Sequence, residues 1–218
     1  MELFCSRLKI KTPETSVIRL GDDVAHFNKS VPVDRLVDKT FILCVGTIEI
    51  RKNHRILLDV WTHLRKELGD RTPILVLVGR HGWLIDELIY KMQNNPDLKR
   101  DVLWLRDILD QQIAWLYKNC LFTIYPSHYE GWGLPVAESL ALGQICLASN
   151  SSSIPEIGGD LVQYFSPTDQ EGLKDLLVSM INLTPNELQT QREKIQKNYK
   201  IYSWADTAKI VFSAVESL

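Results

Sequence analysis

No stretch of this sequence approaches eighteen consecutive apolar residues, so the sequence predicts no membrane-spanning helix. Neither sign of charge dominates, because 25 lysines and arginines are balanced by 27 aspartates and glutamates. This balance excludes the basic footprint of a nucleic-acid-binding protein and argues against a strongly basic membrane-binding surface. The first residues also lack the charged and apolar regions of a signal peptide. We therefore expect a cytoplasmic protein.

Metal-binding and common nucleotide-binding motifs are absent as well. The four cysteines and five histidines show no metal-ligand spacing. Cys44, Cys120 and Cys146 lie in or beside apolar runs, which predicts buried thiols rather than disulfides. The sequence has neither a phosphate-binding Gly-x-x-x-x-Gly-Lys loop nor a Gly-x-Ser-x-Gly nucleophile elbow. Gly131 and Gly133 lack the third glycine of a dinucleotide fingerprint, which argues against NAD.

What the sequence does contain is a regular alternation of short apolar runs with helix-like segments. Such alternation predicts right-handed crossovers and a doubly wound parallel sheet of the α/β, Rossmann-like class. Residues 1–15 show no pattern. The expected strands are 16–21, 41–46, 74–78, 101–105, 121–125, 145–148 and 161–165. The expected helices include 56–64, 84–92, 110–117, 136–142, 171–181 and 204–217, and Asp110, Asp169, Thr184 and Ser203 are the expected N-caps.

Residues 126–138 connect an expected strand to an expected helix and have the composition of a ligand-binding loop. Pro135 suits the first turn of the helix. Gly131 and Gly133 allow the backbone to approach a ligand closely. The amides of Gly133 and Leu134 would lie at the helix N-terminus, where they favour an anion such as phosphate. In open α/β sheets, ligands bind beside such strand-to-helix loops.

Two carboxylates bracket this loop, Glu130 within it and Glu138 eight positions later in the helix. Ionised carboxylates only accept hydrogen bonds, so this pair suits a ligand rich in hydroxyls. A phosphate between two hydroxyl-rich groups describes a nucleotide sugar. A solvated loop followed by an ordinary surface helix is the alternative interpretation of the same residues.

Arg51 and Lys52 follow the expected strand 41–46 on a loop that should face the same crevice as Glu130. Arginine offers a planar fork to phosphate oxygens and lysine a point charge, so the two could neutralise a leaving diphosphate without a metal. Two solvated cations at the start of a helix are the alternative. Because the helix dipole disfavours cations there, this local conflict favours a functional role.

Residues 130–138, with their Glu-Gly-Trp-Gly-Leu-Pro interior, resemble the Glu-x7-Glu signature of retaining glycosyltransferases of family four, which have the GT-B fold. Residues 149–160 are similar to the segment that follows the next strand in that family. The resemblance extends from about Val17 to the end of the chain. It implies that the chain is one half of a GT-B fold, the half that binds the donor.

The resemblance implies a role for each matching residue. Arg51 and Lys52 would stabilise the departing diphosphate, and Glu130 would contact donor hydroxyls near the reacting carbon. Glu138 would accept from the ribose hydroxyls, although pairing with a lysine is an alternative role for it. The other expected substrate-binding residues are Ser127, Gly133 and Leu134 at the phosphates, Ile108 at the nucleobase, and Gly46 at the strand end.

The roles of several neighbouring positions follow less directly from the resemblance. Arg106 stands where the family often has glycine, so it would either alter base recognition or point to solvent. Arg80 and His81 follow another strand-end glycine and could border the sugar-phosphate site. Trp132 stands where the family often has phenylalanine and suggests loop packing. His128 is interpreted as a loop residue rather than a catalytic base.

The resemblance also implies a domain organisation. Residues 1–15 would be a remnant or linker, 16–200 the nucleotide-sugar-binding domain, and 201–218 a helix that crosses back to an N-terminal domain. Gly21, Asp22, Asp23 and Phe27 match a family segment that opens the second domain. We therefore expect the N-terminal acceptor domain to be missing, either because the chain is an excised fragment or because it is a natural half.

Residues 47–54 resemble mannosyl- and rhamnosyltransferases of surface polysaccharides, which implies GDP-mannose as the donor. The expected function is transfer of a hexose to a saccharide or lipid-linked acceptor, without a metal cofactor, in the cytoplasm or at the inner membrane face. An N-terminal domain, in cis or as a separate chain, is the expected partner. One alternative is a non-catalytic module that binds a partner subunit. A nucleotide-sugar epimerase is another, but its usual acid and base residues are not evident.

Overall fold

The computed structural model describes residues 2–13, 15, 17–23 and 29–216. The chain divides into two compact units, one of Asp22–Ile201 and one of Met1–Gly21 with Tyr202–Leu218. Phe27, matched to a family aromatic residue, and Ser16, at the start of an expected strand, lie outside the described residues.

The larger unit is built on a parallel sheet, as the alternating pattern predicted. Within the described residues its six strands have the order β3-β2-β1-β4-β5-β6, the strand order of dinucleotide-binding Rossmann domains. The direction of strand addition reverses between β1 and β4, so the loops that follow these two strands meet at one crevice. The strands are β1 Phe41–Val45, β2 Ile74–Val78, β3 Val102–Leu105, β4 Thr123–Tyr125, β5 Cys146–Ser149 and β6 Gln163–Phe165.

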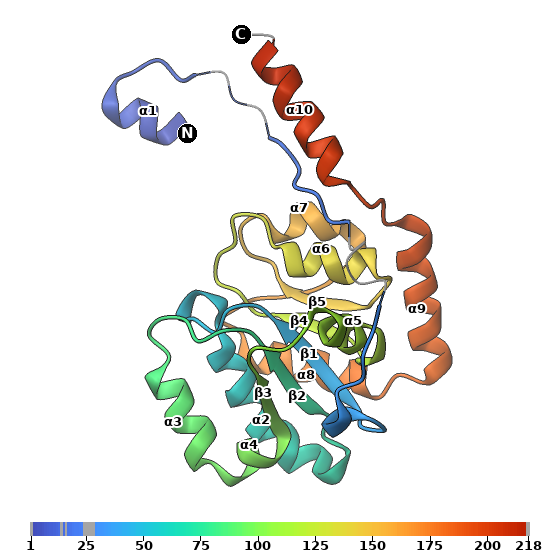
Figure 1. Cartoon of the computed structure of the whole chain (residues 1–218). Helices are drawn as coiled ribbons and strands as arrows, with labels where there is room; N and C mark the ends of the chain where they lie inside the picture. The colour runs from blue at the N-terminus through green and yellow to red at the C-terminus, as the bar shows by residue number, and fades with distance from the viewer. Residues whose placement is uncertain (1, 14, 16, 24–28, 217–218) are drawn as a thin grey trace. The chain divides into compact units, whose positions relative to one another are not determined.

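The central strands are apolar on both faces because helices cover both sides of the sheet (Figure 1). Along β1, Ile42 and Cys44 face a core shared with α2 and α8, whereas Phe41 and Leu43 face a second core shared with α5. The helices are α2 His54–Leu68, α3 Asp86–Asn94, α4 Pro96–Asp101, α5 Asp110–Asn119, α6 Leu134–Ala141, α7 Ile154–Gly158, α8 Gln170–Ile181 and α9 Pro185–Asn198. Short 3-10 turns cover η2 Asp34–Leu36, η3 Ile50–Lys52, η4 Gly69–Arg71 and η5 Gly159–Leu161.

Most of the expected helix starts are confirmed. The side chain of Asp169 accepts from the Gly172 amide at the start of α8, and Thr184 forms a capping box with Glu187 at the start of α9. The prediction that Asp110 is an N-cap is wrong. Asp110 is the first residue of α5 and Leu109 is its N-cap, because the Gln112 side chain rather than an aspartate completes the turn by accepting from the Leu109 amide.

The smaller unit contains α1 Glu2–Leu8 and α10 Trp204–Glu216. The expected strand over 16–21 is wrong for its described part, since residues 17–21 have no regular structure. Residues 2–8 are helical although their sequence showed no pattern. The Thr207 hydroxyl of α10 donates to the Arg19 carbonyl at 2.9 Å, so this stretch is tied to a helix and not to the sheet.

The described cysteines are free thiols and all are buried, as predicted for three of them. Among the described residues, no helix combines the length and the apolar character needed to cross a membrane. The same residues contain no group of three or more histidine, cysteine or acidic side chains arranged to hold a metal.

Candidate donor-binding site

The reversal point of the sheet brings together two loops that are far apart in sequence. One follows β1 and contains Arg51 and Lys52, and the other follows β4 and contains Glu130. A backbone hydrogen bond of 2.9 Å from the His128 amide to the Arg51 carbonyl links them directly. Three residues selected from the sequence therefore lie at one place in the fold.

Glu130 is the centre of a charged cluster. Its Oε1 atom lies 2.6 Å from Nζ of Lys52, and its Oε2 atom lies 2.8 Å from Nη1 of Arg51. The Ser127 hydroxyl donates to the same Oε1 at 2.7 Å, so both carboxylate oxygens are engaged. Arg51 Nη1 also donates to the Tyr129 carbonyl at 2.6 Å. The cluster thus locks the end of one loop onto the other.

These contacts keep Glu130 ionised. Burial opposes its charge, but hydrogen bonds from Lys52, Ser127 and Arg51 outweigh burial and lower the pKa of the Glu130 carboxyl. The hydrogen bond that Arg51 donates to Glu130 in turn raises the pKa of Arg51. The side chains of Lys52 and Arg51 remain 15% and 35% exposed, so both cations can be reached by an anionic ligand.

Gly46 belongs to the same cluster. A Cβ atom added there would lie 3.7 Å from Nζ of Lys52, which shows that the lysine lies across the strand-end backbone. Its neighbour Gly79 is required by close packing, because a Cβ there would come within 2.0 Å of the Gly46 carbonyl oxygen. The two strand ends therefore lie close together at this point.

A second set of contacts fixes the backbone around Glu130. Its amide donates to the Ser152 hydroxyl at 2.8 Å. The Ser153 hydroxyl donates to the carbonyls of Glu130 and Trp132 at 3.0 and 2.8 Å. Trp132 is half-buried and packs against the core, as its interpretation as a loop-packing residue predicted. Ser152 and Ser153, which follow β5, therefore fix the backbone of the loop that contains Glu130.

The start of α6 is the place where the sequence predicted an anion site. Gly133 is the N-cap, in the left-handed region with φ 111°, and Pro135 is in the first turn. Within the described part of the chain, the amides of Gly133 and Leu134 donate to no protein acceptor. They are available to a ligand in front of the helix.

Glu138 lies apart from the charged cluster. Its Oε2 accepts from the Tyr117 hydroxyl of α5 at 3.0 Å, and that hydroxyl lies 3.2 Å from the Tyr125 hydroxyl. Burial raises the pKa of Tyr117 well above its usual value, so the tyrosine remains a donor at neutral pH. Glu138 is thus directed towards α5.

The remaining candidates occupy the rim. Ile108 is half-buried against the core that α5 shares. Arg106 is exposed and its guanidinium lies 4.6 Å from the centre of the Trp104 ring, on which His81 also stacks at 6.2 Å. Arg80 is exposed. These residues form a separate aromatic and basic edge after β2 and β3 rather than part of the Glu130 cluster.

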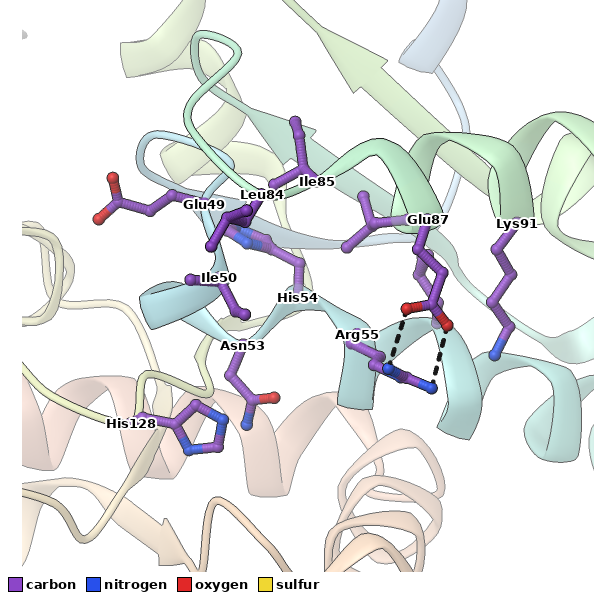
Figure 2. Close-up of a pocket in the computed structure, with 12 residues that line it drawn as sticks. Glu49, Ile50, Asn53, His54, Arg55, Leu84, Ile85, Glu87, Lys91 and His128 are labelled. Atoms are coloured by element: carbon purple, nitrogen blue, oxygen red, sulfur yellow. Dashed lines mark hydrogen bonds and ion pairs between the residues drawn. The ribbon is translucent and has the colours of Figure 1, made fainter.

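Beside the cluster lies a cavity of about 280 Å³ between the N-terminal ends of α2 and α3. Its lining includes Leu58, Leu84 and Ile85, with the Arg55–Glu87 ion pair across it (Figure 2). Figure 2 shows the Glu49 carboxylate directed away from that ion pair. Glu130 and Lys52 are not among its lining residues, so the cavity is a neighbour of the charged site and not its centre.

Sequence reasoning missed several residues that build the site. Glu49 forms an ion pair with Arg51, with Glu49 Oε1 2.6 Å from Arg51 Nη2. Asn53, in the left-handed region with φ 56°, donates from Nδ2 to the carbonyls of Pro126 and Pro167 at 3.0 and 2.9 Å. Ser152 and Ser153 lay in a segment recognised by resemblance, but nothing in their spacing indicated that they contact Glu130. The one signal for Asn53 in the sequence was an asparagine shortly before the expected helix 56–64.

Comparison with known proteins identifies the family of the chain. The family model described as Glycosyl transferases group 1 matches residues 28–200. The O-antigen chain mannosyltransferase B of Escherichia coli is 31% identical over 179 residues, covering 82% of this chain and 46% of that protein. The serotype-specific mannosyltransferase WbdA of Escherichia coli is 25% identical over 205 residues, covering 91% of this chain and 25% of that protein.

The crystal structure of TarM has a similar fold, with a TM-score of 0.62 at 15% identity, covering 87% of this chain and 36% of that one. The predicted class, a doubly wound Rossmann-like half of a GT-B fold, is confirmed by the sheet and by this likeness. The chain spans less than half the length of these relatives. Since the family model matches most of its residues, the chain belongs to the group 1 glycosyltransferases.

Proposed function

We propose that this chain is the donor-binding domain of a retaining glycosyltransferase that transfers mannose from GDP-mannose to a saccharide or lipid-linked acceptor in polysaccharide synthesis. The observation that carries the proposal is the Lys52–Glu130–Arg51 cluster at the reversal point of the sheet, in a chain of this family. The names of two relatives, both mannosyltransferases, support mannose as the transferred sugar.

In this proposal, each part of the crevice meets one part of the donor. The diphosphate lies between the cations Arg51 and Lys52 and the free amides of Gly133 and Leu134. These groups stabilise the negative charge that grows as the bond from the sugar carbon to the phosphate oxygen breaks. No metal is needed for this charge, because the two cations and the helix end supply the compensation.

The hydroxyl-rich parts of the donor meet the two carboxylates. Glu130 accepts from hydroxyls of the transferred sugar, and Glu138, held by the Tyr117 hydroxyl, accepts from the ribose. The backbone near Ile108 contacts the base. The acceptor hydroxyl attacks the face of the sugar from which the diphosphate leaves, so configuration is retained. The acceptor site itself belongs to an N-terminal domain, in cis or on a separate chain.

The direct test is calorimetric titration of this chain with GDP, UDP and ADP in the presence of EDTA. We expect one nucleotide, GDP, to bind without metal, and the Glu138→Ala variant to lose about tenfold in affinity because a hydrogen-bonded, charged acceptor is removed. Glu67→Ala, an exposed glutamate on α2, is the matched control. Binding that requires Mg²⁺, or equal affinity of the Glu138→Ala variant, would contradict the proposal.

A partner-binding module without catalytic activity is the second candidate. It is favoured by the apolar side chains that α10 exposes, with Phe212 at 67% and Val215 at 61% exposure. Large exposed apolar side chains on one helix are typical of a binding surface. Failure of all three nucleotides to bind, together with co-purification of a separate polypeptide lost in a Phe212→Ser variant, would favour this candidate.

A further inference from the structure

Arg51 is held at both ends of its guanidinium group. Nη1 donates to the Tyr129 carbonyl and to Glu130, at 2.6 and 2.8 Å, and Nη2 donates to Glu49 Oε1 at 2.6 Å. The Glu49 side chain is only 13% exposed. The guanidinium is therefore fixed in orientation before any ligand arrives, with Glu130 on one edge and Glu49 on the other.

Glu49 is itself held by the connection between β2 and α3. Its Oε2 accepts from Nε1 of Trp83 at 3.1 Å. The Trp83 carbonyl accepts from the Ile50 amide at 3.4 Å, and Gly82 donates to the Ile48 carbonyl at 2.8 Å. A Cβ atom on Gly82 would lie 2.8 Å from Cβ of Glu49, so this glycine permits the close packing. The contacts form a chain from Trp83 through Glu49 to Arg51.

The negatively charged Glu49 can affect phosphate binding by Arg51 in two opposite ways. A carboxylate 2.6 Å from an arginine that binds phosphate reduces the positive potential offered to the phosphate. On charge alone, Glu49 would weaken donor binding. An arginine side chain, however, loses rotamer entropy when a ligand fixes it, and fixing it in advance removes that cost from binding. Glu49 is largely buried and accepts a hydrogen bond from Trp83, so it is suited to fixing Arg51 in advance.

We propose that Glu49, oriented by Trp83, is a positioning residue that presents the Arg51 guanidinium to the terminal phosphate of a nucleoside diphosphate. The phosphate contact rests on the proposed function, whereas the positioning of Arg51 by Glu49 does not. Arg51 acts on the ligand, Glu49 acts on Arg51, and Trp83 acts on Glu49. The terminal phosphate is the part of the nucleotide that distinguishes GDP from GMP.

The first test compares GDP with GMP by calorimetry for wild type, Glu49→Gln and Trp83→Phe. We expect Glu49→Gln to leave the GMP affinity within about twofold and to lower the GDP affinity by about threefold to tenfold. Trp83→Phe keeps an aromatic side chain but replaces the indole and removes its N–H, and should lower the GDP affinity by about twofold in wild type and not at all in the Glu49→Gln background. An increase in GDP affinity on Glu49→Gln would show that Glu49 acts only as a nearby negative charge and would overturn the proposal.

A second test needs no nucleotide. Nuclear magnetic resonance of the Arg51 side chain should show separate, slowly exchanging Nη signals in wild type, and faster rotation in Glu49→Gln. Glu87→Gln, which removes a carboxylate from the neighbouring Arg55–Glu87 pair, is the matched control and should leave Arg51 unchanged. Unchanged Arg51 signals in Glu49→Gln would overturn the positioning role. Ordered Arg51 signals in a protein that binds no nucleotide would instead contradict the proposed function and leave the positioning of Arg51 by Glu49 intact.

Discussion

The Nζ atom of Lys52 lies 2.6 Å from Oε1 of Glu130, although 77 residues separate the two in the chain. The lysine follows β1 and the glutamate follows β4, neighbouring parallel strands at the point where the strand order reverses. Arg51 occupies the other oxygen of the same carboxylate. In the proposed function, Glu130 would therefore compete with the donor phosphates for the two cations nearest to it.

Because of this competition, we predict that removing the charge of Glu130 strengthens the binding of GDP. Glu130→Gln should raise the affinity of the chain for GDP by about threefold to tenfold, because Lys52 and Arg51 would then face the phosphates without a carboxylate between them. Titration calorimetry measures the change. Ser127→Ala, which removes a hydrogen bond to the same oxygen and leaves its charge, is the control and should have a smaller effect. A weaker GDP complex in Glu130→Gln would mean that the glutamate holds the cations in place for the ligand.

Removing the lysine should destabilise the fold. Glu130 is only 8% exposed, so Lys52→Met leaves a buried carboxylate with part of its compensation gone. We expect the free energy of unfolding in urea to fall by about 1–3 kcal/mol, since Arg51 and Ser127 still contact the carboxylate. Adding Glu130→Gln to this variant should restore most of the loss. No recovery in the double variant would contradict a charge-based cause.

Asn53 offers a matched pair of variants that separates backbone strain from hydrogen bonding. Asn53→Ala loses both side-chain hydrogen bonds and places alanine at φ 56°, and should cost about 2–4 kcal/mol of unfolding free energy. Asn53→Gly removes the same bonds but tolerates the positive φ, and should cost about 1 kcal/mol less. Equal losses in urea denaturation would show that the left-handed conformation contributes nothing.

His54 predicts a dependence of stability on pH. Burial, with a smaller contribution from the Lys52 charge, lowers the pKa of His54 from 6.5 to about 4. Above pH 6.5 the residue is neutral in both states and has no effect. Between pH 6.5 and 4 the unfolded chain binds a proton that the folded chain does not, so stability falls as the pH decreases, by about 3 kcal/mol in total.

The check is urea denaturation of wild type and His54→Gln at pH 7.0 and pH 5.0. Wild type should lose more stability over this interval than the variant, because glutamine cannot bind the proton. His63→Gln, an exposed histidine on the same helix, should behave like wild type. The same loss of stability in His54→Gln as in wild type would assign the pH dependence to other groups.

The fold was predictable where periodicity alone decides structure. β1 and β2 are continuous apolar runs, and both were found within one residue of their ends. Strand β4 covers only residues 123–125 of an expected 121–125, although Leu121 donates to the Phe41 carbonyl and Phe122 accepts from the Leu43 amide, at 2.8 and 3.1 Å. Residues 17–21 looked like a strand because they begin with the β-branched Val17 and Ile18, yet the sequence pattern cannot show whether a partner strand is available.

The candidate site was predictable as two loops that face one crevice, but its ion pairs were not. Glycines, strand ends and residue chemistry indicated Arg51, Lys52 and Glu130 individually. Nothing local indicated that the glutamate pairs with both cations, because such contacts depend on which strands are neighbours in the sheet. Glu49 and Ser152 were missed for the same reason, since a glutamate and a serine in loops are ordinary residues until tertiary structure gives them partners.

The reversal of strand order has a consequence for how the protein folds. Strands β1, β2 and β3 form one consecutive half of the sheet and β4, β5 and β6 the other, and the two halves join through β1 and β4. The ion pairs of Glu130 cross this seam, so neither half can form the charged cluster alone. Contacts between residues so distant in sequence form after local ones, because closing a long loop costs entropy first. We therefore expect the charged site to assemble late in folding, when the two halves of the sheet join.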